Sequence, residues 1–187
     1  IPEGPLDLAD YSKVELQFMS DAKATPDMVF SVFLYDSANR VIKADLPSSF
    51  LTSAKWQKFS VSVNAFVDET WDDGYGTDTP DAVRSDIVAF GLMVVGNEVD
   101  QTGVFKVDSI TLVEKTTTPG PGADGPLAID NFESYADDAG ITTNWAYSKA
   151  GGPVGLVPHL EFNYPAEGAK CLRMEVNMPE KWWHNSL

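Results

Sequence analysis

The sequence predicts an all-β protein, an antiparallel β-sandwich of the jelly-roll type. Six stretches are apolar either at every second residue or on both faces, and clusters of Gly, Pro, Asn, Asp and Ser separate them. No stretch carries a helical apolar stripe longer than about one turn. Several short strands divided by such turns favour two packed antiparallel sheets over a helical or mixed fold.

The expected strands fall into two kinds. Those that alternate, as half-buried strands do, are Lys13–Phe18, Trp56–Val63, Val104–Val113 and Lys170–Met178. In the last of these, Leu172, Met174 and Val176 are expected to face inward. Met28–Asp36 and Ile87–Val95 are apolar on both faces, which is typical of central strands covered on two sides.

Composition narrows the class of protein. The chain has 187 residues, is 43% hydrophobic and carries a net charge of −15, so it is globular and strongly acidic. The acidic balance argues against nucleic acid and anionic membrane surfaces as partners. No apolar run approaches the roughly 18 residues of a membrane span. The single cysteine, Cys171, cannot form an internal disulfide, and we expect an unreactive thiol. The start at Ile1 favours a processed or excised piece of a longer protein.

A Pro/Gly-rich stretch divides the chain. Residues 116–126, TTTPGPGADGP, favour an extended linker because Pro and Gly support neither helix nor sheet. Residues 1–115 begin without an opening hairpin. Residues 127–187 hold too few strands to bury much surface alone. Each piece looks like an incomplete sandwich.

Read in the opposite order, the two pieces resemble one known kind of domain. Six short motifs occur in the cyclic order of that domain. They are an opening D-x-F-E-like motif (Asp130–Glu133), a Trp that follows it (Trp145), a strand similar to GK-x-L (Gly168–Val176), an Asp-Leu-x-x-Tyr turn (Asp7–Tyr11), a W-x-x-F strand (Trp56–Val61) and a closing G-x-F-x-V-D-x-I-x-L strand (Gly103–Leu112). The chain therefore resembles a carbohydrate-binding module of the galactose-binding-like jelly-roll type, similar to family 11, with its parts in circularly permuted order. Residues 1–115 correspond to the C-terminal portion and residues 127–187 to the N-terminal portion.

Three explanations fit this order. The chain is a circular permutant closed by its linker, a slice of a tandem array, or a subunit whose two parts complete different neighbours. In the last case, head-to-tail contacts that do not close would generate a filament.

The resemblance implies a structural calcium ion. In such modules this ion lies where the opening F-E motif meets the closing V-D motif, which corresponds here to Glu133 and Asp108, with Asp130 as a weaker candidate. Ca²⁺ takes about six to eight oxygen ligands, so carboxylates and loop carbonyls from two chain ends could hold the sandwich closed. The alternative is that these acids are solvated residues at strand ends.

Aromatic residues near acids suggest a glycan-binding site. The segment Val67–Asp86 is rich in Asp and carries Trp71 and Tyr75, whose rings could stack on a sugar. The segment could equally be an interface or cation loop, or a solvated insertion. Trp182 and Trp183 point to opposite faces if the segment is extended. One is expected to pack in the core, and the other either lies on a binding face or is an anchor buried by the next segment. Trp56 and Trp145 are expected to be structural.

The sequence gives little reason to expect catalysis. It holds no G-x-S-x-G nucleophile motif, and its acids are too abundant for any pair to indicate a glycosidase. We therefore expect a non-catalytic, extracellular or cell-surface β-sandwich that binds a polysaccharide or other glycan. The alternative is a structural subunit that self-associates head to tail.

Overall fold

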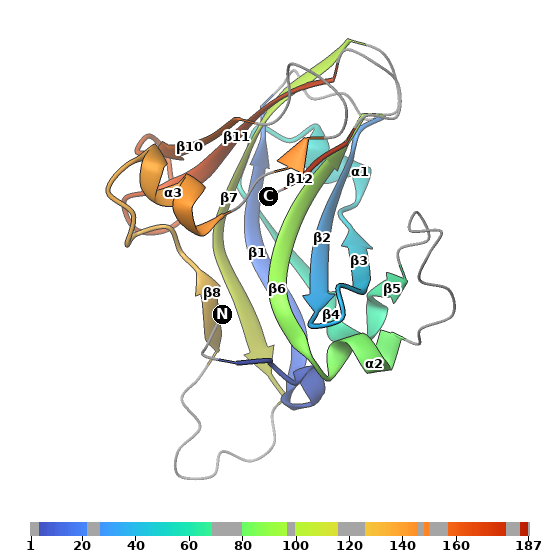
Figure 1. The fold of residues 1–187 in the computed structure, drawn as a ribbon. Helices are drawn as coiled ribbons and strands as arrows, with labels where there is room; N and C mark the ends of the chain where they lie inside the picture. Colours follow the sequence, from blue (N-terminus) through green and yellow to red (C-terminus); the bar gives the residue numbers. More distant parts are fainter. Residues whose placement is uncertain are drawn as a thin grey trace.

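The computed structural model describes residues 4–21, 27–68, 80–96, 100–115, 126–145, 148–149, 157–178 and 184–186. It confirms the predicted all-β sandwich, because two antiparallel sheets pack face to face (Figure 1). Sheet A has the order β5–β3–β2–β6–β12–β9, and sheet B the order β10–β11–β7–β1–β4, with β8 pairing with β7.

The strands of sheet A are β2 (Val29–Asp36), β3 (Val41–Asp45), β5 (Val67–Asp68), β6 (Ile87–Val95), β9 (Ser148–Lys149) and β12 (His184–Ser186). Those of sheet B are β1 (Tyr11–Ser20), β4 (Gln57–Ser62), β7 (Gln101–Glu114), β8 (Leu127–Asp130), β10 (Val157–Glu161) and β11 (Cys171–Met178). The expected alternating strand 170–178 is confirmed, since Leu172, Met174 and Val176 are all buried.

The segment after the linker contributes to both sheets. In sheet B, β8 and β11 pair with β7, and β10 pairs with β11. In sheet A, β12 pairs with β6 and β9. In this structure the later segment therefore pairs with strands of its own chain, as the circular-permutant explanation requires.

The core lies between the sheets and is centred on aromatic rings. Phe105 of β7 is fully buried, and its ring centroid lies 5.8 Å from that of Phe18 and 5.7 Å from that of Phe30. The Phe18 and Phe30 rings meet edge to face with their centroids 4.7 Å apart. These rings join sheet B to sheet A, because Phe18 belongs to β1 and Phe30 to β2.

Sheet A also carries apolar residues on its other face. Phe33, Met93 and Val95 form a second buried cluster, separate from the main core, and Tyr35 stacks on Phe33 with ring centroids 6.2 Å apart. This cluster confirms the prediction that strands 28–36 and 87–95 are apolar on both faces.

Short helices complete the described part of the chain. They are α1 (Ser48–Leu51), α2 (Pro80–Arg84), α3 (Asp138–Asn144) and the 3-10 turns η1 (Leu8–Asp10) and η2 (Val63–Ala65). The sequence predicts no helix of this length at 138–144. The helix begins there because the Asp137 carboxylate accepts a hydrogen bond from the Gly140 amide, which caps it.

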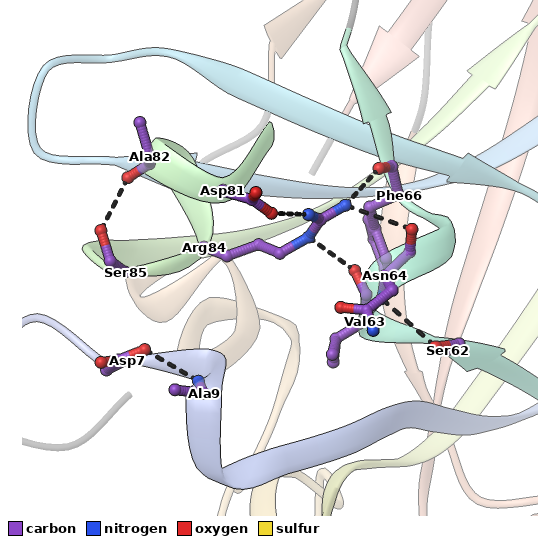
Figure 2. Close-up of polar contacts among 10 residues, drawn as sticks. All are labelled: Asp7, Ala9, Ser62, Val63, Asn64, Phe66, Asp81, Ala82, Arg84 and Ser85. Atoms are coloured by element: carbon purple, nitrogen blue, oxygen red, sulfur yellow. Dashed lines mark hydrogen bonds and ion pairs between the residues drawn. The ribbon is translucent and has the colours of Figure 1, made fainter. Parts of the chain in front are cut away.

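Arg84 fixes α2 against the neighbouring turn. Its guanidinium donates to the carbonyl oxygens of Val63 at 2.8 Å, Phe66 at 2.8 Å and Asn64 at 3.3 Å, while Asp81 accepts from it at 2.5 Å (Figure 2). One cation thus satisfies three backbone acceptors where the chain turns from β4 toward β5.

Candidate functional site

Whether Glu133 and Asp108 lie close together, as predicted, depends on which strands pair with each part of β7. Strand β1 occupies one edge of β7. On the other edge, β11 pairs with residues Gln101–Val107 and β8 pairs with Ile110–Leu112. Asp108 and Ser109 therefore lie between the two partner strands, and the chain leaving β8 and the chain entering β11 meet there. We call this place the β8/β11 junction.

Asp108 is buried at the junction and holds the loop that precedes β11. Its side chain is 1% exposed, and Oδ2 accepts hydrogen bonds from the amides of Ala166 and Glu167, both at 3.0 Å. Burial raises the pKa of this carboxyl, and the loop amides and Ser109 act against that rise. The Ser109 hydroxyl lies 3.3 Å from Asp108 Oδ1 and 3.1 Å from Glu167 Oε2, so it connects the buried Asp108 carboxylate to the exposed Glu167 carboxylate.

Glu133 holds the same loop nearer to its end. Its Oε1 accepts hydrogen bonds from the amides of Ala169 and Lys170, both at 2.8 Å, and these bonds lower the pKa of Glu133. Gly168 has a φ of 62°, and a Cβ atom added there would lie 2.3 Å from Glu133 Oε1. Only glycine allows the backbone to approach this carboxylate so closely.

Lys170 reaches back across the junction. Its ammonium donates to the carbonyl oxygen of Glu133 at 2.8 Å and to that of Tyr135 at 2.7 Å. The side chain therefore ties the entry of β11 to the turn that follows β8. It provides a positive charge at a place where backbone and carboxylate oxygens converge.

Asp130 has a different environment from the other two predicted ligands. Its Oδ1 accepts from the Phe132 amide at 2.7 Å, and its Oδ2 accepts from the Tyr135 hydroxyl at 2.5 Å and the Trp145 indole at 2.8 Å. Burial and the nearby Asp130 carboxylate raise the pKa of Tyr135 to about 12. Asp130 thus orients two aromatic side chains, and Trp145, as predicted, is structural and buried.

The donor chemistry of the junction fits a calcium ion poorly. Glu133 Oε1 and Asp108 Oδ2 each accept two amide hydrogen bonds, so the loop already uses one oxygen of each carboxylate. The carbonyl oxygens of Glu133 and Tyr135 accept from an ammonium. In the part of the chain that the structure describes, no group of three or more His, Cys, Asp or Glu side chains could hold a metal ion.

The held loop, residues 162–170, runs over the outer face of sheet B. Lys106 of β7 donates to the Asn163 carbonyl at 2.9 Å, and the Trp56 indole donates to the Tyr164 carbonyl at 2.9 Å. Trp56 is therefore half-buried on this face and braces the loop. Cys171 is fully buried, and burial raises the pKa of its thiol to about 12, in keeping with the predicted unreactive thiol.

The loop presents two aromatic side chains to solvent. Tyr164 is 81% exposed and Phe162 is 57% exposed. Among the large hydrophobic side chains that the structure describes as exposed, these two are the aromatic ones, and the others are Val67, Val88 and Val157. Two exposed rings two residues apart on a braced loop form a candidate binding surface.

Backbone strain gathers in the same region. Of the described non-glycine residues with positive φ, Ser109, Phe132 and Tyr164 lie at the junction or on its loop, with φ of 52°, 61° and 59°. Bulky residues rarely adopt this conformation, and it persists where the surrounding contacts fix it. Such strain is often found at functional sites, which makes the 162–170 loop the leading candidate.

The four aromatic residues predicted to bind a glycan, Trp71, Tyr75, Trp182 and Trp183, lie outside the described residues. The sequence analysis did not single out the 162–170 loop and missed Phe162 and Tyr164 as exposed rings. The available signal was two aromatic residues within EFNYPAEG, directly before a strand of the core.

In comparisons with known proteins, no family model, curated protein or solved structure matches the chain. The resemblance to carbohydrate-binding modules therefore rests on the order of short motifs. None of the described helices is long and apolar enough to cross a membrane.

Proposed function

We propose that the chain is a non-catalytic, extracellular glycan-binding module, and that the exposed rings of Phe162 and Tyr164 contact the sugar. The observation that carries the proposal is the exposure of two aromatic rings on a loop that is fixed from three separate places in the sequence. These places are Trp56, strand β7 with Lys106 and Asp108, and Glu133.

The chemistry of these side chains suits a sugar. The faces of aromatic rings attract the partly positive C–H groups of a pyranose, and nearby polar groups can pair with its hydroxyls. Asn163 lies between the two rings in sequence, and Lys106 and Glu161, 3.5 Å apart, lie beside the loop. The net charge of −15 disfavours anionic glycans, so a neutral glycan is the expected ligand class.

The bracing of the loop supports affinity. A loop that is already held in one conformation loses little conformational entropy when a ligand binds. The positive φ of Tyr164 and the hydrogen bond from Trp56 to its carbonyl fix the backbone from which the ring projects.

A glycan array containing neutral and charged polysaccharides tests the function. We expect binding to a neutral glycan and none to charged ones. In an affinity gel containing that glycan, migration of the Tyr164→Ala variant should no longer be retarded. The control is Val157→Ala, which removes an exposed apolar side chain, 46% exposed, from strand β10 before the loop. Absence of binding to every glycan would refute the function, and equal retardation of the wild type and Tyr164→Ala would refute the site.

The alternative function, a structural subunit that assembles head to tail, has support from one feature of the fold. Strand β7 belongs to the segment before the linker, and its partners β8 and β11 belong to the segment after it. The same pairing could form between copies by exchange of these strands. Light scattering distinguishes the two arrangements, because a closed single chain has a mass of 20.4 kDa and exchanged chains form larger particles.

A further inference from the structure

The β8/β11 junction contains its own cation. Lys170 begins the approach to β11, and its side chain is half-buried. The ammonium lies 2.8 Å from the Glu133 carbonyl oxygen and 2.7 Å from the Tyr135 carbonyl oxygen. The amide of the same residue donates to Glu133 Oε1 at 2.8 Å. One residue thus contacts three oxygens of the turn 133–135.

These oxygens are of the kind that calcium would need at this place. A calcium ion requires about six to eight oxygens at roughly 2.3–2.6 Å. An ammonium at hydrogen-bond distance from two carbonyl oxygens fills the space in front of them and repels a second cation. The loop already uses one oxygen of each carboxylate at the junction, because Glu133 Oε1 and Asp108 Oδ2 each accept two amide hydrogen bonds.

We infer that the Lys170 ammonium replaces a structural calcium ion in this chain, so that the 162–170 loop is closed without a metal. The inference does not depend on the proposed function, because it concerns what holds the loop and not what the loop binds. The close fit of Gly168 against Glu133 supports it, since a Cβ atom added at Gly168 would lie 2.3 Å from Glu133 Oε1 and leaves no room between loop and carboxylate on this side.

The test compares melting temperatures of the wild type, Lys170→Met and Lys106→Met, each in chelator and in millimolar Ca²⁺. Methionine keeps much of the apolar stem of lysine and removes its charge. Lys106→Met is the matched control because the Lys106 ammonium also donates to a loop carbonyl, that of Asn163, but lies on β7. We expect the wild type to melt at the same temperature in both solutions. Lys170→Met should melt roughly 5 °C lower in chelator.

The effect of added Ca²⁺ on the melting temperature should distinguish the two variants. In Lys170→Met the two carbonyl oxygens lose their cation, so Ca²⁺ should restore part of the lost melting temperature in this variant but not in Lys106→Met. A wild-type melting temperature that falls in chelator and rises with Ca²⁺ would overturn the inference. So would a Lys170→Met variant that melts at the wild-type temperature in chelator.

A second measurement uses terbium luminescence. Tb³⁺ binds in calcium sites and emits when a nearby aromatic ring transfers energy to it, and Tyr135 and Trp145 lie beside the junction. We expect any sensitised emission that Ca²⁺ can displace to be the same in the wild type and in Glu133→Gln. Displaceable emission that is lost in Glu133→Gln would show a metal site at the junction, and the Lys170 inference would be wrong.

Discussion

The replacement of Asp108 tests the junction most sharply. Its Oδ2 accepts from two loop amides, Ala166 and Glu167, and the side chain is 1% exposed. Asp108→Ala removes the acceptor for both amides. A buried donor left without a partner costs about 1–3 kcal/mol, and these amides lie on a partly exposed loop, so the lower half of that range applies to each. We expect Asp108→Ala to lower the free energy of unfolding by about 2–4 kcal/mol.

Asp108→Asn is the matched variant. Asparagine keeps one oxygen that can accept both amides, and its amide nitrogen can donate to the Ser109 hydroxyl. It also removes a buried charge, whose desolvation raises the pKa of Asp108. We therefore expect Asp108→Asn to stay within about 1 kcal/mol of the wild type at neutral pH.

Urea denaturation measures both variants, and hydrogen exchange at the Ala166 and Glu167 amides reports the loop directly. In Asp108→Ala these two amides should exchange faster, while amides of β7 keep their relative protection. If Asp108→Ala costs less than about 1 kcal/mol, or if Asp108→Asn costs as much as Asp108→Ala, the carboxylate does not hold the loop as described.

Three further predictions concern pH, the glycine and the arginine. Burial places the folded-state pKa of Asp108 above its unfolded value of about 3.9. The wild type should therefore lose stability relative to Asp108→Asn as pH rises through that folded pKa. Urea denaturation from acidic to neutral pH measures this difference, and a difference of opposite sign would contradict the prediction. Gly168→Ala should lower the free energy of unfolding by at least about 1–2 kcal/mol, because the φ of 62° strains alanine and the added Cβ would meet Glu133. The control is Gly4→Ala, where φ is 113° and no atom lies within 4 Å of the added Cβ. An equal loss of stability in both variants would show that the contact with Glu133 is unimportant. Arg84→Met should cost about 2–4 kcal/mol in thermal or urea unfolding, because three carbonyls lose one donor, and an unchanged stability would show that water replaces it.

The pattern of apolar residues predicted the long strands, because in these strands the buried positions are the apolar positions of the sequence. Strands β1, β2, β6, β7 and β11 combine several apolar residues with alternation or two-sided burial, and each is at least eight residues long. Strand β8 has four residues, too few for a period to show. Strand β10 contains Pro158, which argues against a central strand and is tolerated here at the edge of sheet B.

The candidate site was only partly predictable for a different reason. The motif order identified Glu133 and Asp108, and both do hold one loop. It could not show that their partners are loop amides and a lysine, because these contacts join residues 36 to 59 positions apart. The backbone carbonyl of Tyr164 accepts a hydrogen bond from Trp56, 108 positions away, and no local pattern reports such a contact.

The claim that the 162–170 loop binds a neutral glycan is tested most directly by calorimetric titration of the double variant Phe162→Ala/Tyr164→Ala with the best ligand from the array. The double variant removes mostly exposed ring surface, so its melting temperature should stay close to that of the wild type. We predict that its affinity falls at least about tenfold, which corresponds to roughly 1.4 kcal/mol or more, a reasonable loss for two stacked rings. A double variant that is folded and binds the glycan as tightly as the wild type would contradict the claim.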